Sequence, residues 1–322
     1  MSRSACLIFN PVAGQGDPHQ DLATIRAILE PEIVLDVQLT TVDLDAGQLA
    51  KIAVSRGVEA IIASGGDGTL SAAAAALIGT NIPLGIISRG TANAFANALA
   101  LPDTLDGACQ TILAGYTKTV DAAYCNGQAM VLLAGIGFEA ETVEQADRTA
   151  KNRLGMLAYV VSGLQRLREL ESFDAEIETD DQIIKVTAAA ITVANAAPPT
   201  SILAQGPAGV LYDDGLLDLT IVAPMNARGA IAASFHLLQT ALTGTATERD
   251  DIGYLRAKRV KVTTDPPQKV ALDGEIIGTT PIEVECVPGG LTIFATATEE
   301  IQPAEKLEGL PNLVIEVKSP SS

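Results

Sequence analysis

The chain has 322 residues, of which 48% are hydrophobic, and this length and composition predict a globular protein of two domains. It carries 21 Lys and Arg against 39 Asp and Glu, and the formal net charge of -18 argues against nucleic acid or an anionic bilayer as an electrostatic partner. The 4 cysteines and 2 histidines show no metal-ligand spacing, so neither a zinc site nor a disulfide framework is indicated.

Hydropathy argues against a membrane-spanning protein. The N-terminal apolar stretch is too short for a signal peptide, and no run approaches the roughly 20 apolar residues that cross a bilayer. We therefore expect a cytoplasmic protein with at most peripheral membrane contact. Residues 152–170 have an apolar face and basic ends, so this segment could touch lipid, although such a stripe more often packs on a sheet.

The first part of the chain, from residue 5 to about 122, alternates short β-rich runs with helical runs. Strands are expected at 6–9, 34–41, 60–63 and 84–87, and helices at 21–29, 46–56, in the alanine-rich stretch before residue 79, and at 91–99. Strands separated by helices predict a doubly wound α/β domain with a mostly parallel sheet, which binds ligands at the carboxyl ends of its strands.

The most informative segment is 61–70, in which an apolar strand is followed by Gly-Gly-Asp-Gly-Thr. Glycines let backbone N–H groups approach a polyphosphate, and the helix that follows would direct the positive end of its dipole at the same anion. A nucleotide site is therefore the first hypothesis, with Asp67 facing Mg²⁺ or a transferable proton. The alternative is an ordinary turn between strand and helix.

Two further segments follow expected strands of the same sheet. Asn10, in the loop 10–16, could hydrogen-bond across the crevice, although Asn-Pro beside glycine is also a common turn. In the loop after strand 84–87, Thr91 could serve as the N-cap of the next helix or as a phosphate donor. The P-loop and dinucleotide fingerprints are absent, and no Gly-x-Ser-x-Gly elbow occurs.

After about residue 124 the pattern changes to short β-type runs separated by turn residues, which predict an antiparallel β-sandwich. Strands are expected at 130–138, 173–179, 183–193, 216–222, 259–263, 269–272, 282–287 and 291–296, with helices at 148–170 and 227–242.

In their order along the chain, several motifs resemble those of the bacterial lipid kinases built on the diacylglycerol kinase catalytic domain, a family that includes sphingosine and ceramide kinases. The motifs are Asn10-Pro11 to Gly14, Gly65 to Thr69, Gly90-Thr91 to Phe95, Asp121, Asn195, Leu211 to Leu216 and Asp273-Gly274-Glu275. The resemblance implies a nucleotide-binding domain at 1–125, a β-sandwich acceptor domain at 126–296, a chain end at about 297–322 that returns to the first domain, and an active site in the inter-domain cleft.

The resemblance also implies an ATP- and Mg²⁺-dependent kinase that phosphorylates a hydroxyl of a diacylglycerol-like or related lipid. Glu275 would be the general base, with Asp273 and Asp67 in the catalytic set, and Asp121 would join the carboxylate and Mg²⁺ network. A structural metal-binding loop would comprise Leu211, Asp214 and Leu216. The expected nucleotide-binding residues are Asn10, Thr40, Gly65, Gly66, Asp67, Gly68, Thr69, Thr91 and Asn93.

Other interpretations stay open at this point. Without the resemblance, Asp213-Asp214-Gly215 is a turn and Asp273-Gly274 is a hairpin signal. The chain also departs from the family pattern, because Ala94 replaces the usual aspartate and Ser88-Arg89 replaces the usual proline. The alternatives are an NAD kinase-like enzyme on a soluble acceptor and a non-catalytic nucleotide or lipid sensor. The oligomeric state is open, with a homodimer as one alternative.

Overall fold

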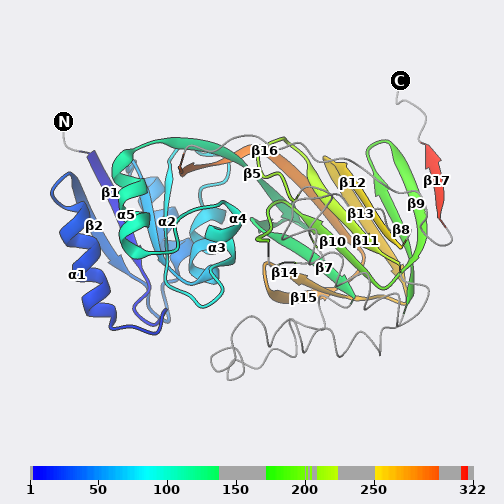
Figure 1. Ribbon diagram of the computed structural model, residues 1–322, viewed down its shortest axis with the longest axis horizontal. Coiled ribbons are helices and arrows are strands. Elements are labelled where there is room, and N and C mark those ends of the chain that lie inside the picture. Colours follow the sequence, from blue (N-terminus) through cyan, green and yellow to red (C-terminus); the bar gives the residue numbers. More distant parts are fainter. Residues whose placement is uncertain are drawn as a thin grey trace. The chain divides into compact units, whose positions relative to one another are not determined.

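The computed structural model describes residues 3–137, 172–199, 201, 204, 209–223, 251–296 and 313–317. The chain forms two compact units (Figure 1). Unit 1 comprises Met1–Ala122 and Pro288–Glu300, and unit 2 comprises Ala123–Val287 and Ile301–Ser322. The helices expected at 148–170 and 227–242, including the segment considered for lipid contact, lie outside the described residues.

Unit 1 contains the predicted parallel sheet, in the order β2-β1-β3-β4. Its strands are β1 (Arg3–Phe9), β2 (Ile33–Leu39), β3 (Ile61–Gly65) and β4 (Leu84–Ser88). After β1 the chain first adds β2 on one side and then β3 on the other. The carboxyl ends of β1 and β3 therefore form the topological switch point, where open α/β sheets bind ligands.

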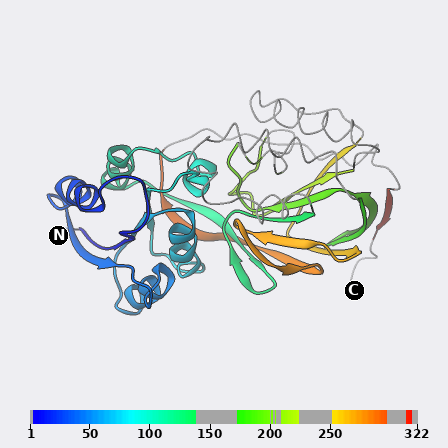
Figure 2. The ribbon, with the colours of Figure 1, turned by 90° about the horizontal axis from the view of Figure 1, so that it is seen from below.

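Helices cover both faces of this sheet (Figure 2). They are α1 (Pro18–Leu29), α2 (Ala46–Ser55), α3 (Asp67–Ala75), α4 (Ala94–Ala98) and α5 (Leu105–Ala114). Helices α1 and α5 contact each other, as do α2 and α3. The sequence prediction missed α5, although Thr104 caps its first turn and Gly115 ends it at φ 71°.

Unit 2 is the predicted antiparallel β-sandwich, in which two sheets bury a common hydrophobic core. One sheet has the order β12-β11-β10-β7-β14-β15, and the other runs β17-β9-β8-β13-β16. The strands are β7 (Leu133–Gly137), β8 (Phe173–Thr179), β9 (Gln182–Ala188), β10 (Ala190–Ala194), β11 (Leu217–Val222), β12 (Ile252–Ala257), β13 (Arg259–Asp265), β14 (Lys269–Leu272), β15 (Glu275–Thr279), β16 (Ile282–Phe294) and β17 (Val314–Val317).

Two strands contribute residues to both units. They are β5 (Thr117–Cys125), which also pairs with the short β6 (Gln128–Met130), and β16, which the sequence predicted as two strands. Within unit 1, Ile293 of β16 pairs in parallel with Leu84 of β4. Pro288–Glu300 belongs to unit 1, whereas Ile301–Ser322 belongs to unit 2, where β17 pairs with β9.

Candidate functional site

A hydrogen bond joins the two loops at the switch point of unit 1. Asn10, which directly follows β1, donates from Nδ2 to Oγ1 of Thr69 on α3 over 2.8 Å. Its Oδ1 accepts from the backbone N–H of Val12 at 3.1 Å, and its own N–H donates to the carbonyl of Ser64 at 2.9 Å. The Asn10 side chain is therefore held in one orientation and connects the loop after β1 to the glycine-rich turn after β3.

Two glycines of this edge are required by close packing. A Cβ on Gly65 would lie 2.6 Å from the Cβ and Oγ1 of Thr69, and a Cβ on Gly90 would lie 3.0 Å from the Cα of Gly66. Gly68 is different, since a Cβ there would meet nothing within 4 Å. Helix α3 begins at this turn without a side-chain cap, so its first N–H groups are suited to an anion.

The predicted residues Asp67, Asn93, Thr91 and Thr40 all lie in unit 1. The Oδ1 atom of Asp67 accepts from the backbone N–H of Phe95 at 3.1 Å, which links the first turn of α3 to α4. Asn93 is the N-cap of α4 at φ 48° and makes no side-chain cap bond, so the N-cap interpretation of Thr91 is wrong, and Thr91 is exposed. Thr40 follows β2, and its N–H donates to the carbonyl of Phe9 at 3.0 Å.

Three buried side-chain oxygens lie near the carboxyl ends of the strands of unit 1. Within the described part of the chain, the buried Oγ atoms of Ser64 and Ser88 and the Oδ1 atom of Asn93 have no hydrogen-bond partner. Ser64 and Ser88 belong to the carboxyl ends of β3 and β4, and Asn93 precedes α4. Ser64 pairs with Ile87, and Ser88 pairs with Gly65, so the two serine side chains point to opposite faces of the sheet and do not form one cluster.

From the sequence, Arg89 was noted only as a departure from the family pattern. In the structure, Arg89 connects three segments of unit 1. Its side chain is 4% exposed and forms an ion pair with Asp21 of α1 at 2.8 Å. The Nη1 atom donates to the carbonyl of Asn10 at 2.9 Å, and the guanidinium lies 4.2 Å from the centre of the Phe9 ring. The signal in the sequence was a lone cation between an apolar strand and a glycine.

Asp121 also has a structural partner inside unit 1. It is 4% exposed, and its Oδ1 accepts from the backbone N–H of Gly289 at 2.7 Å. Gly289 adopts φ 59°, a conformation that favours glycine. Asp121 therefore holds the segment of β16 that enters unit 1.

In unit 2, the carboxylate of Asp273 accepts three backbone N–H groups. Val131 donates to Oδ2 at 2.9 Å, and Leu132 and Leu133 donate to Oδ1 at 2.9 and 3.0 Å. The same segment is held from its other side, because the Nδ2 of the buried Asn195 donates to the Val131 carbonyl at 3.1 Å. Asp273 is thus an organising residue for the chain before β7, a role that the sequence did not reveal.

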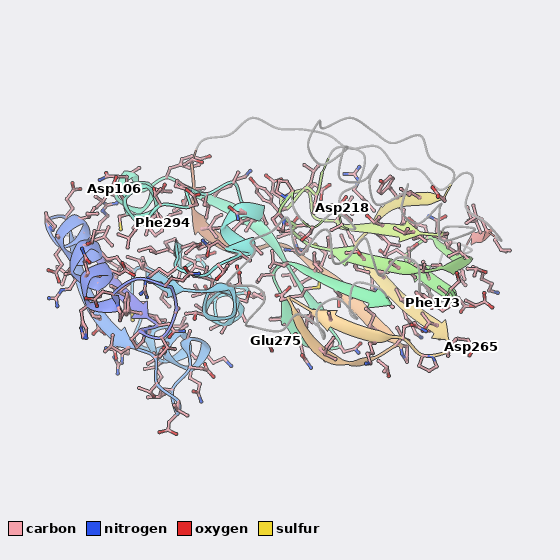
Figure 3. All side chains as sticks on the ribbon, turned by 60° about the horizontal axis from the view of Figure 1, so that its bottom comes forward. Asp106, Phe173, Asp218, Asp265, Glu275 and Phe294 are labelled. Carbon is pink, nitrogen blue, oxygen red and sulfur yellow. The ribbon has the colours of Figure 1, made fainter. Side chains whose placement is uncertain are left out.

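Glu275 lies two residues beyond Asp273, at the start of β15 (Figure 3). Asp273 and Gly274 adopt φ 47° and 90°, and Leu272 pairs with Glu275, which makes a two-residue hairpin turn. The hairpin signal in the sequence is therefore present in the structure. The turn leaves the Glu275 side chain exposed.

The expected metal-binding loop, 211–216, precedes β11. Asp214 accepts the Leu216 N–H on Oδ1 at 3.0 Å and contacts Arg256 through Oδ2 at 2.6 Å. Leu211 donates its N–H to Asp218 at 3.2 Å. In the residues that the structure describes, no group of three or more His, Cys, Asp or Glu side chains could hold a metal ion.

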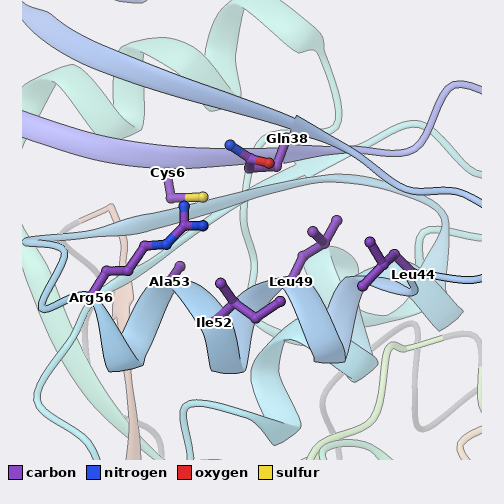
Figure 4. A pocket seen from close by; sticks show the side chains of 7 residues that line it. All are labelled: Cys6, Gln38, Leu44, Leu49, Ile52, Ala53 and Arg56. Atoms are coloured by element: carbon purple, nitrogen blue, oxygen red, sulfur yellow. The ribbon is translucent and has the colours of Figure 1, made fainter.

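A cavity of about 150 Å³ lies between α2 and the first two strands of unit 1 (Figure 4). Cys6, Gln38, Leu44, Leu49, Ile52, Ala53 and Arg56 line it. None of the residues expected to bind nucleotide belongs to this set, so the cavity is a separate feature.

Among the described helices, none is long and apolar enough to cross a membrane.

Comparison with known proteins identifies the family. Residues 4–125 match the diacylglycerol kinase catalytic domain, and residues 133–295 match the YegS C-terminal NAD kinase beta sandwich-like domain. An uncharacterized protein of Synechocystis sp. is 49% identical over 305 residues, covering 91% of this chain and 70% of that protein. Diacylglycerol kinase of Bacillus subtilis is 30% identical over 314 residues, covering 96% and 99%.

A solved structure has the same fold. The crystal structure of a diacylglycerol kinase from Bacillus anthracis str. Sterne superposes with a TM-score of 0.71 at 25% identity, covering 91% of this chain and 97% of that chain. Both units therefore match in sequence and in fold. The chain belongs to the diacylglycerol kinase catalytic-domain family of lipid kinases.

Proposed function

We propose that this protein transfers the γ-phosphate of ATP to a hydroxyl group of a diacylglycerol-like or related lipid. The observation that carries the proposal is the Asn10–Thr69 hydrogen bond at the switch point, beside Gly68, where a Cβ would meet nothing within 4 Å. Relatives named as diacylglycerol kinase support the lipid acceptor, which we infer by analogy.

Unit 1 would bind ATP through the turn Gly65–Thr69 and the first N–H groups of α3. The dipole of this helix and the backbone donors favour the phosphates. Thr91, which is exposed, and Asn93, whose Oδ1 is unpaired among the described residues, would contact the same nucleotide from the loop before α4.

Mg²⁺ would neutralise charge on the phosphates. The donor set of unit 1 fits a magnesium ion brought in with ATP. Asp67 supplies a carboxylate in the first turn of α3, fixed by its bond to the Phe95 N–H. Ala94 supplies no second carboxylate. We therefore propose that the phosphates themselves provide most of the ligands, as is common for Mg²⁺.

Glu275 would act as general base. The acceptor hydroxyl oxygen forms a bond to the γ-phosphorus, the bond from that phosphorus to the bridging oxygen of ADP breaks, and the hydroxyl proton passes to the Glu275 carboxylate. Asp273 would position Glu275, because its carboxylate is engaged by three backbone N–H groups. In this proposal ATP is assigned to unit 1 and the base to unit 2.

The direct test incubates the full chain with γ-labelled ATP, Mg²⁺ and a mixed lipid extract in detergent, followed by extraction of the organic phase. We expect a labelled lipid whose formation is lost in Asp67→Ala and reduced about 100-fold or more in Glu275→Gln. Glu285→Gln is the matched control, because Glu285 is an exposed carboxylate on β16 of the same unit. Near-normal turnover by Glu275→Gln would remove the base assignment.

The other interpretations predict different products. An NAD kinase-like enzyme would place label in the aqueous phase only when NAD is added. A sensor would bind ATP and be stabilised, by about 2.7 kcal/mol at 100 times the dissociation constant, without transferring phosphate to either acceptor.

A further inference from the structure

The family resemblance implied a metal ion in the loop 211–216. In the structure, the Asp214 carboxylate of this loop forms an ion pair with the side chain of Arg256. Arg256 Nη1 lies 2.6 Å from Asp214 Oδ2, and the two side chains are only 23% and 21% exposed. The other oxygen of Asp214 accepts the Leu216 N–H at 3.0 Å. Both carboxylate oxygens therefore have donors from the protein itself.

Arg256 is placed there by strand pairing. It belongs to β12, and in the antiparallel register it lies opposite Asp218 of β11. Asp218 is 6% exposed, and its Oδ2 accepts the Leu211 N–H at 3.2 Å. The guanidinium thus comes from the strand next to the loop, and Asp214 and Asp218 tie the loop at its two ends.

A divalent cation does not fit this arrangement. Calcium binds oxygens at about 2.3–2.6 Å and needs six or more of them, and magnesium needs six at about 2.0–2.1 Å. A cation on Asp214 Oδ2 would displace Arg256 or lie next to its positive charge. A guanidinium can satisfy the same carboxylate through charge-assisted hydrogen bonds without a further ligand.

We propose that Arg256 supplies, from within the chain, the positive charge that the family pattern assigns to a metal ion at Leu211, Asp214 and Leu216. The loop 211–216 is then folded by a guanidinium and two carboxylates and takes no divalent cation. This inference is independent of the proposed catalysis, because the loop contains none of the residues assigned to ATP or to proton transfer.

The test is thermal unfolding of the full chain without nucleotide, in excess EDTA and in saturating Ca²⁺ or Mg²⁺, for the wild type and for Asp214→Asn. We expect the metal to shift Tm equally in these two proteins, because any response comes from other sites. A shift in the wild type that Asp214→Asn abolishes would show that Asp214 binds a cation and would overturn the proposal.

Removal of the guanidinium provides the second arm. Arg256→Met keeps the apolar stem and should lower Tm by about 2–4 °C in EDTA, which Ca²⁺ should reverse because Asp214 becomes available. The reversal should be lost in Arg256→Met with Asp214→Asn. Arg259→Met is the control, since its pair with Asp180 is exposed and long, at 3.9 Å. Absence of an Asp214-dependent Ca²⁺ response in Arg256→Met would also overturn the proposal.

Discussion

Arg89 and Asp21 form a two-point contact in which Nε and Nη2 of the guanidinium both lie 2.8 Å from Oδ2 of the carboxylate. Arg89 follows β4, and Asp21 belongs to the first turn of α1. Because Arg89 also donates to the carbonyl of Asn10, this ion pair connects three segments at the switch point. A buried cation with one carboxylate partner is costly to leave unpaired.

We therefore predict that Arg89→Met lowers the free energy of unfolding by about 2 kcal/mol, between the values for exposed and fully buried pairs. The Asn10 loop would lose its anchor, so the KM for ATP should rise while kcat changes less. Urea unfolding and steady-state kinetics measure the two effects. Arg26→Met is the control, because its pair with Glu30 lies on the exposed face of α1 and should contribute less than about 0.5 kcal/mol.

Replacement by alanine should affect stability differently at Gly65 and at Gly68. Gly65→Ala would drive its new Cβ against Thr69, so we expect a loss of about 1–3 kcal/mol and loss of ATP binding. Gly68→Ala adds a methyl group in open space on α3 and should leave stability equal or slightly higher. If phosphates approach this turn, Gly68→Ala should nevertheless weaken ATP binding. Calorimetric titration with ATP, together with unfolding curves, separates folding from binding.

Substitutions of Asp273 should mainly lower stability, whereas substitution of Glu275 should mainly lower turnover. Asp273→Ala removes the acceptor of three N–H groups and should cost about 2–4 kcal/mol. Asp273→Asn tolerates the positive φ but turns an NH₂ group towards the Val131 N–H, so it should cost less. Glu275→Gln should unfold like the wild type and lose turnover. Equal stability of Asp273→Ala and wild type would contradict the organising role of Asp273.

Alkaline pH should destabilise the protein through its buried thiols. Burial raises the pKa of Cys6 from 9.0 to about 11 and that of Cys109 to about 12. Burial, with a contribution from Asp273, raises the pKa of Cys125 to about 11. Above pH 9.0 the unfolded chain releases these protons while the folded chain keeps them, so stability falls as pH rises towards 11.

Each thiol should lower stability by up to about 1.4 kcal/mol per pH unit in this window. Urea unfolding across the window measures the slope. The variant with alanine at all three cysteines is the comparison, since tyrosines and lysines titrate in the same range in both proteins. An unchanged slope in that variant would show that the thiols are not responsible.

The sequence by itself determined the secondary structure class of both halves and the edge of the sheet at which Asn10 and Thr69 meet. Alternation of apolar runs with helical ones specifies a parallel sheet, and glycines after β3 mark the switch point, because these preferences act over a few residues. Asn10 and Thr69 each follow a predicted strand, so the sequence also predicts that they lie at one edge of the sheet, where they form a hydrogen bond.

Only the tertiary structure decided which polar side chains form hydrogen bonds or ion pairs with other groups of the protein. Asp273 accepts N–H groups that lie 140 to 142 residues away in the chain. Arg256 contacts Asp214 from β12, and Arg89 pairs with Asp21, which precedes it by 68 residues. Similarly, β16 passes through Pro288 and Gly289 as one strand, and Asp121 accepts the Gly289 N–H from 168 positions away in the chain. Such partners depend on how distant segments pack, and local propensity carries no information about that packing.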